Sequence, residues 1–151
     1  MKRLFALLGG AVLSYSSISS AAPTPFEYKH HPKAVSEKRM RAVYSLIQHS
    51  SDNQHKVRWA ILNAMSQTRG PAWLLEGEGD GYILARWDYK GHAIIHRIEY
   101  NDKAVQIKYD GGVHDYKCKL LVDGYCYNTH RRYYKYNISL VEQLRKELSE
   151  L

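Results

Sequence analysis

The 151-residue sequence predicts an α+β domain in which helices pack on one face of an antiparallel meander of three or four strands. Apolar residues first recur with helical spacing, between residues 34 and 66. The pattern changes to strict alternation over residues 82–109, and helical spacing returns near the C-terminus. Helical runs that precede alternating runs joined by tight turns are typical of helices segregated on one face of an antiparallel sheet.

The first 22 residues have the features of a secretory signal peptide. Lys2 and Arg3 precede the apolar segment LFALLGGAVL, and Ser20-Ala21-Ala22 fits a small-x-small cleavage site, so we expect cleavage after Ala22. The apolar segment is shorter than the roughly 20 residues of a membrane anchor. We therefore expect a periplasmic or secreted protein without a transmembrane anchor.

The remainder reads as an extended N-terminal lead-in, residues 23–34, and a single α+β domain, residues 35–151. The lead-in contains PTPFEYKHHP, whose three prolines oppose regular structure. The formal net charge of the chain is +7, and +5 once Lys2 and Arg3 are removed. Such a mild excess attracts anionic surfaces without specifying one.

Two helices are predicted in the first half of the domain. The first covers residues 34–48, with Ser36 as its N-cap. The second follows Asp52 or Asn53, either of which could cap it, and is stopped by Gly70-Pro71. Its apolar positions follow the i, i+3, i+4 rule closely and are Val57, Ala60, Ile61, Ala64 and Met65.

The strands follow. A short strand at residues 73–75 leads into EGEGDG, which reads as a flexible acidic hairpin tip without the spacing of a calcium loop. Three alternating runs come next, joined by turns at Lys90-Gly91 and Asn101-Asp102. The buried face should hold Trp87, Ile98 and Ile107, and the opposite face Arg86, Arg97 and Lys108. DGGVHDYKC is then expected to form a loop.

Cys118 and Cys126 are the two cysteines of the chain. In an oxidising compartment, two thiols that flank a short segment with Asp123-Gly124 in it predict one disulfide that closes a loop. The seven intervening residues do not match a redox motif, and a zinc site would need further ligands.

The last segment, YYKYNISLVEQLRKEL, predicts a helix with an apolar stripe. Ser139 and Glu142 could instead form a capping box that starts the helix later, and both starts remain open. In either case Arg131, Arg132 and Lys135 should point outward. The stripe consists of Tyr133, Tyr136, Leu140, Val141, Leu144 and Leu148.

Three segments together resemble an uncharacterised family of small bacterial cell-envelope proteins, many of them lipoproteins. They are VRWAILNAMSQTRGPAW, GYILARWDYKGHAIIHRIEYNDKAVQIKY and THRRYYKY, within residues 55–148. The chain departs from the family pattern in its missing lipobox cysteine, the spacing of Gly70 and Trp73, and the Cys118–Cys126 loop. The resemblance implies fold and location rather than activity. It implies family positions at His92, Tyr100, Tyr109, His130, Tyr133 and Tyr136.

Recognisable catalytic motifs are absent from the sequence: it holds no nucleophile elbow, P-loop, dinucleotide fingerprint or zinc-protease helix. His92 and His96 share a strand face but stand about 13 Å apart, too far for one ion, so we expect no metal and no cofactor. The alternative is a small periplasmic hydrolase or nuclease that uses His130 with His92 or His114, an imidazole serving as base.

We expect a non-catalytic binding or accessory module whose cationic face holds an anionic envelope component or a protein partner. Export argues against nucleic acid as that partner, although cations and aromatic rings in HRRYYKY suit phosphates and bases. A third hypothesis is pairing through an exposed strand edge near Trp73. The expected cationic face consists of His130, Arg131, Arg132 and Lys135 with an exposed Tyr134, joined by Arg86, Arg97 and Lys108 if they lie nearby.

Overall fold

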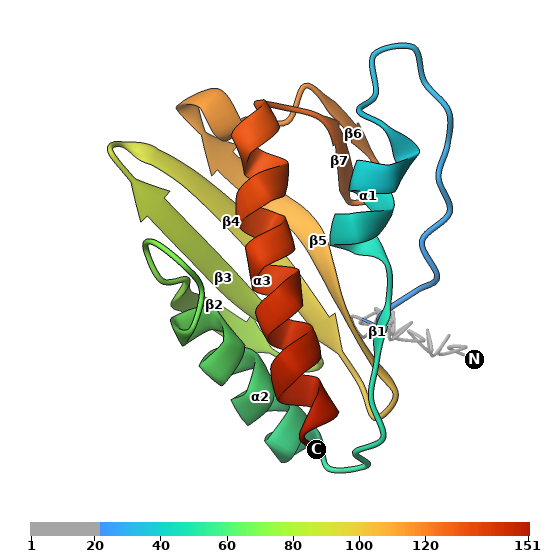
Figure 1. The fold of residues 1–151 in the computed structure, drawn as a ribbon, viewed down its shortest axis with the longest axis vertical. Helices are drawn as coiled ribbons and strands as arrows, with labels where there is room; N and C mark the ends of the chain where they lie inside the picture. The colour runs from blue at the N-terminus through green and yellow to red at the C-terminus, as the bar shows by residue number, and fades with distance from the viewer. Residues whose placement is uncertain (1–21) are drawn as a thin grey trace, which may run out of the picture.

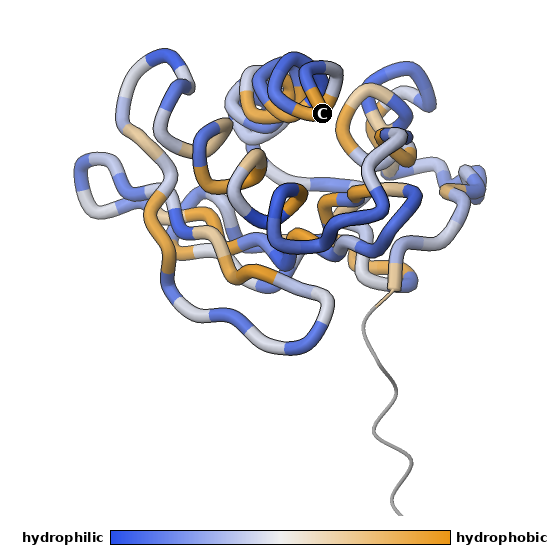
Figure 2. The backbone as a smooth tube through the Cα atoms, turned by 90° about the horizontal axis from the view of Figure 1, so that it is seen from below, coloured by the Kyte–Doolittle hydropathy of each residue, from blue (hydrophilic) through white to orange (hydrophobic). Residues whose placement is uncertain are grey.

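The computed structural model describes residues 22–151, so the expected signal peptide lies outside the described residues apart from Ala22. The predicted α+β class is confirmed: three helices pack on one face of an antiparallel sheet (Figure 1). The sheet has five strands in the order β1-β5-β4-β3-β2, one more than the upper limit predicted, and a separate hairpin, β6-β7, lies beside it. Viewed from below, hydrophobic positions of the helices turn toward the sheet (Figure 2).

Helix α1 spans Glu37–Tyr44, so the first predicted helix was too long. The chain turns extended at Ser45, and strand β1, Ile47–Gln48, pairs with β5. Ile47 was expected on the helical stripe and is instead buried as a strand residue opposite Val105. Pairing with β5 thus buries the same side chain that a further turn of helix would have buried.

Helix α2, Gln54–Ser66, starts at one of the two predicted caps. The Oδ1 of Asn53 accepts hydrogen bonds from the backbone N–H groups of His55 and Lys56, at 3.0 and 3.2 Å. Those bonds satisfy two of the donors that the first turn of any helix leaves free. All five apolar positions predicted for this helix are buried.

The meander consists of β2 (Leu74–Gly79), β3 (Tyr82–Tyr89), β4 (His92–Tyr100) and β5 (Ala104–Val113). The hairpin tip predicted over EGEGDG is shorter than expected, because its first four residues belong to β2: Gly77, Glu78 and Gly79 pair with β3, and Glu76 lies at a bulge between Leu75 and Gly77. Only Asp80 and Gly81 form the turn. Glycine and glutamate disfavour strands, but a partner strand supplies the backbone hydrogen bonds regardless of side chain.

The segment predicted as a loop is largely ordered structure. Strand β5 continues to Val113, and the 3₁₀ helix η1, His114–Tyr116, follows. The predicted disulfide between Cys118 and Cys126 is present and ties the chain after η1 to β7. Strands β6 (Leu120–Val122) and β7 (Tyr125–Asn128) meet at Asp123-Gly124, both with positive φ, as a two-residue hairpin turn requires.

The extended lead-in runs along the β5–β7 side of the molecule. The Thr24 N–H donates to Gln106 Oε1 at 2.9 Å, and Gln106 Nε2 donates to the Thr24 carbonyl at 2.7 Å. Phe26 is buried, with its ring edge-on to Tyr125 at 4.9 Å between centroids. The lead-in is therefore attached to the domain by hydrogen bonds and by aromatic packing.

Helix α3, Arg131–Ser149, lies across the sheet and begins earlier than either predicted start. Trp87, Ile98 and Ile107 are buried under the helices, as predicted. Of the predicted stripe, Tyr136 is only partly buried, and Tyr134 and Asn137 join it at the core. No helix within residues 22–151 has the length and hydropathy needed to span a bilayer.

A polar pair lies in the core between α3 and the sheet. His96 is fully buried; its Nδ1 contacts the Lys108 carbonyl at 3.1 Å, and its Nε2 contacts the Asn137 side-chain amide. Burial lowers the pKa of His96 to about 4, so the ring is neutral at pH 7. A neutral ring has one N–H, which donates to the Lys108 carbonyl, so Nε2 must accept a hydrogen bond. The Asn137 amide lies with Oδ1 against Nε2 and can donate to it only if its oxygen and nitrogen are exchanged.

Candidate anion-binding surface

The first turns of α3 present three cations to solvent. Arg131, Arg132 and Lys135 are all exposed, and we call these three the cationic surface. His130 is the N-cap, and its Nδ1 accepts a hydrogen bond from the Arg132 backbone N–H at 3.3 Å. The prediction that these cations point outward is confirmed.

Tyr134 does not belong to this surface, and its predicted exposure was wrong. Its side chain is 1% exposed, and its hydroxyl donates to the Cys126 carbonyl at 3.1 Å. Burial raises the pKa of Tyr134 well above its usual range. Adjacent Tyr133 and Tyr134 both fit inside because α3 lies between the sheet on one side and α1 with β7 on the other.

Arg86, Arg97 and Lys108 lie on the opposite face of the sheet, so the condition under which they would join the cationic surface, that they lie near it, is not met. Arg86 pairs with Asp88 at 2.7 Å, and Lys108 pairs with Glu99 at 2.7 Å. Arg97 contacts the same Glu99 at 3.3 Å and covers the ring of Tyr82 at 3.7 Å. These cations have partners within their own sheet.

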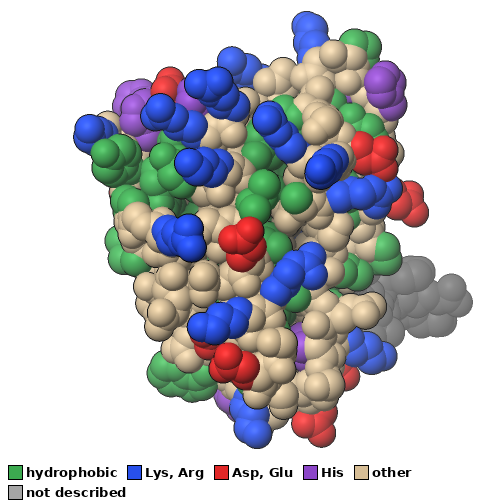
Figure 3. All heavy atoms as spheres, viewed as in Figure 1, with side chains coloured by type: hydrophobic (Ala, Val, Ile, Leu, Met, Phe, Trp, Pro, Cys, Tyr) green, Lys and Arg blue, Asp and Glu red, His purple; other side chains and the backbone are tan. Residues whose placement is uncertain are grey.

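The cationic surface has no such partners. Within residues 22–151, none of its three side chains forms an ion pair, and the first turn of α3 contains no acidic residue. In the view onto α3, Lys and Arg side chains gather over the upper part of the face, around the N-terminal half of that helix (Figure 3). The positive charge there is open to a ligand.

A pocket of about 480 Å³ adjoins the cationic surface, between α3 and the segment after α2. Its floor includes Tyr136, whose ring stacks on Trp87 at 4.4 Å between centroids. Arg69 was not among the predicted site residues, because only the fold brings residue 69 beside residue 135. The lining consists of Arg69, Gly70, Lys135, Tyr136, Ile138, Ser139 and Glu142.

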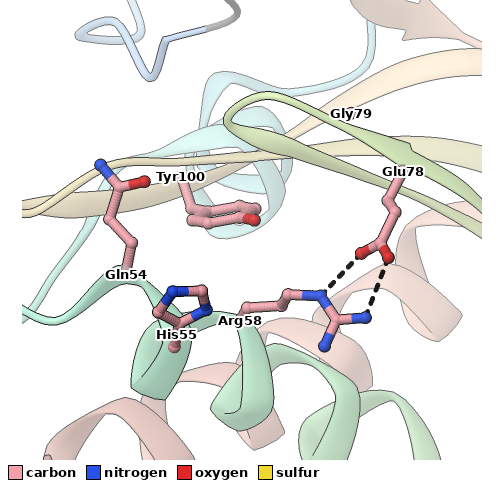
Figure 4. Close-up of a pocket in the computed structure, with 6 residues that line it drawn as sticks. All are labelled: Gln54, His55, Arg58, Glu78, Gly79 and Tyr100. Carbon is pink, nitrogen blue, oxygen red and sulfur yellow. Dashed lines mark hydrogen bonds and ion pairs between the residues drawn. The ribbon is translucent and has the colours of Figure 1, made fainter.

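A second pocket, of about 520 Å³, lies at the start of α2 and was also not predicted (Figure 4). Arg58 points across it at Glu78 and donates two hydrogen bonds, at 2.7 and 3.0 Å. Arg58 lowers the pKa of Glu78, which keeps the carboxylate charged. Opposite charges thus neutralise each other here. The other lining residues are Gln54, His55, Gly79 and Tyr100.

Two of the three histidines of the hydrolase alternative, His92 and His130, each contact the ring of Tyr116. The rings of His92 and His130 lie 5.7 and 6.0 Å from that of Tyr116, and His114 lies 5.8 Å from His92. His92 Nδ1 is 3.8 Å from Asp115 Oδ2. Within residues 22–151, no three His, Cys, Asp or Glu side chains are arranged to hold a metal ion.

The exposed strand edge expected near Trp73 begins one residue later, at Leu74. Trp73 precedes edge strand β2 and is buried, stacked on His96 at 5.0 Å. The exposed apolar side chains of the edge are Leu74 and Leu75 instead.

Comparison of the chain with family models, curated proteins and solved structures found no match.

Proposed function

We propose that this protein is a non-catalytic, exported binding module that holds an anionic component of the bacterial cell envelope on its cationic surface. The disulfide supports an oxidising compartment, where such bonds persist. Its predicted signal peptide and its resemblance to envelope proteins support the same location. The observation that carries the proposal is the contrast between unpaired cations on α3 and paired cations on the sheet.

The position of these cations also opposes the stability of their own helix. Arg131 and Arg132 occupy the first turn, where the helix dipole favours anions by about 0.3–1 kcal/mol per charge. Arg131 and Lys135 stand four residues apart, where like charges repel. Placements that lower stability without a structural gain are characteristic of functional sites.

The size of the attraction can be bounded. A basic residue near an anionic membrane surface contributes about 1 kcal/mol. Three such residues therefore raise the binding affinity for that surface by roughly two orders of magnitude. This contribution is screened by salt, because the Debye length falls from about 10 Å at 0.1 M to about 3 Å at 1 M.

Sedimentation with lipid vesicles tests the proposal. We expect binding to phosphatidylglycerol vesicles, little binding to phosphatidylcholine vesicles, and loss of binding at 1 M salt. The double variant Arg131→Gln/Arg132→Gln should bind at least tenfold more weakly, whereas Arg86→Gln, which removes a paired cation, should bind like the parent. Titration with an oligonucleotide tests nucleic acid as the alternative polyanion. Binding that ignores both salt and the double variant would refute the proposal.

The contacts of His92 and His130 with the same ring, Tyr116, and of His92 with His114 favour a second candidate function, hydrolysis of phosphodiesters with an imidazole as base. Two variants test it without loss of the fold. His130→Asn keeps a side chain that caps helices well, and His92→Gln keeps a polar group beside Asp115. Turnover of a chromogenic phosphodiester that both variants abolish would replace the binding function; turnover that neither changes would exclude these imidazoles.

A further inference from the structure

The pocket beside the cationic surface contains charges of both signs that do not pair with each other. Arg69, Lys135 and Glu142 line it, all three are exposed, and within residues 22–151 none takes part in an ion pair. In the pocket at the start of α2, by contrast, Arg58 and Glu78 satisfy each other. The α3 pocket therefore leaves cationic and anionic contacts for one ligand.

Helix geometry orders these groups along one wall. Lys135, Ser139 and Glu142 follow the i, i+4, i+7 spacing of a single helix face. Glu142 stands about 10 Å further along the axis than Lys135, at 1.5 Å per residue, and Ser139 lies between them. A ligand along this wall would meet a cation, then a hydroxyl, then a carboxylate.

The floor between the charged ends is partly apolar and held in place. Tyr136 stacks on the fully buried Trp87, which fixes its ring. Ile138 adds an aliphatic side chain to the lining. A short hydrocarbon link between two charged groups suits such a floor, and the pocket volume of about 480 Å³ lies within the usual range for small-molecule sites, about 300–1,000 Å³.

We propose that this pocket binds a phosphate ester that carries a primary ammonium group, the chemistry of a phosphoethanolamine headgroup. Arg69 and Lys135 contact the phosphate, Ser139 donates a hydrogen bond to it, and Glu142 accepts from the ammonium. This inference rests on the proposed function, since it names the ligand class that the cationic surface brings to α3. A simple anion would leave Glu142 without a role and facing a like charge.

Calorimetric titration of the purified protein with soluble phosphoethanolamine tests the pocket. We expect phosphoethanolamine to bind about threefold more tightly than inorganic phosphate, and phosphocholine, whose quaternary nitrogen has no N–H to donate, to bind like phosphate. Arg69→Gln should weaken the binding of phosphate and of phosphoethanolamine to the same extent. Glu142→Gln should remove the preference for phosphoethanolamine without lowering the affinity for phosphate. Arg145 is an exposed cation on the same helix outside the pocket, so Arg145→Gln should change neither affinity.

The same titration separates this inference from the proposed function. If phosphoethanolamine binds no better than phosphate, or if Glu142→Gln leaves the preference intact, the inference is overturned. Vesicle binding that still depends on Arg131 and Arg132 would then leave the proposed function standing. Vesicles with and without phosphatidylethanolamine distinguish the source of the headgroup: a gain only with the free compound assigns the pocket to a soluble ester, and a gain in both assigns it to lipid.

Discussion

The two faces of this molecule carry the same kinds of cation under opposite conditions. On the open face of the sheet, Arg86 and Arg97 each have an acidic residue two positions later in the same strand, and the side chains meet. On α3, the residue four positions after Arg131 is Lys135, another cation. A strand places i and i+2 side by side, and a helix places i and i+4 side by side. Positive charge is therefore available to a ligand on one face and neutralised on the other.

The largest expected effect concerns the layer on which both faces depend. The pKa of His96 is about 4 in the fold, below its usual 6.5, so below pH 6.5 the unfolded chain binds a proton that the folded chain does not. The free energy of unfolding therefore keeps its full value above pH 6.5 and is lower by about 3 kcal/mol at pH 4.

Urea unfolding at pH 7 and pH 4 measures this loss. His96→Gln, which cannot titrate, should flatten the dependence on pH whatever its own stability. An equal slope in the parent and the variant would show that other groups cause the acid sensitivity.

The disulfide should matter to the α3 face more than to the sheet face. Cys118→Ala/Cys126→Ala should lower the free energy of unfolding by about 2.5 kcal/mol, from the closure of so short a loop. The Cys126 carbonyl accepts from Tyr134, so the start of α3 should loosen first. Hydrogen exchange of α3 amides, compared with those of β3, would reveal uniform opening if the expectation is incorrect.

Removing one acid should abolish the difference between the faces. Glu99 is nearly buried and contacts both Arg97 and Lys108. Glu99→Gln should cost about 1–3 kcal/mol of stability and create a second salt-sensitive anion site on the sheet. Vesicle binding of Glu99→Gln/Arg131→Gln/Arg132→Gln measures the new site, and no recovery over Arg131→Gln/Arg132→Gln would mean that pairing does not control availability.

The smallest effect has the opposite sign. Arg131→Glu/Arg132→Glu should stabilise the fold by about 1 kcal/mol, because acids replace cations at the dipole-positive end of α3. The same variant should lose vesicle binding. Thermal unfolding at low salt measures the change in stability. A melting temperature below that of the parent would show that Arg131 and Arg132 do not destabilise α3.

The sequence predicts those parts of the fold that depend on local period. Alternation over residues 82–109 locates three strands, and the spacing around Val57 locates α2. It does not show that Ile47 would pair with Val105 or that Glu76 would enter a strand, because those outcomes depend on partners distant in the sequence. Pattern alone therefore misplaced the end of α1 and the start of α3, and it made β2 too short.

The candidate site was predicted in part for the same reason. Outward cations follow from the helix stripe around Leu140, so Arg131, Arg132 and Lys135 could be named. The burial of Tyr134 requires a second packing surface, which α1 and β7 provide only after folding. Arg69 and the pairing of Glu99 likewise depend on contacts between distant segments.

The two hydrogen bonds between Thr24 and Gln106 lie next to the predicted signal-peptide cleavage site. They hold the chain two residues after the expected cut at Ala22. A leader peptidase needs this stretch free and extended in its own cleft, which the docked segment cannot offer. For a chain that is exported and cut after Ala22, as the sequence predicts, proteolytic release should therefore come first and closure of the N-terminal segment against β5 afterward.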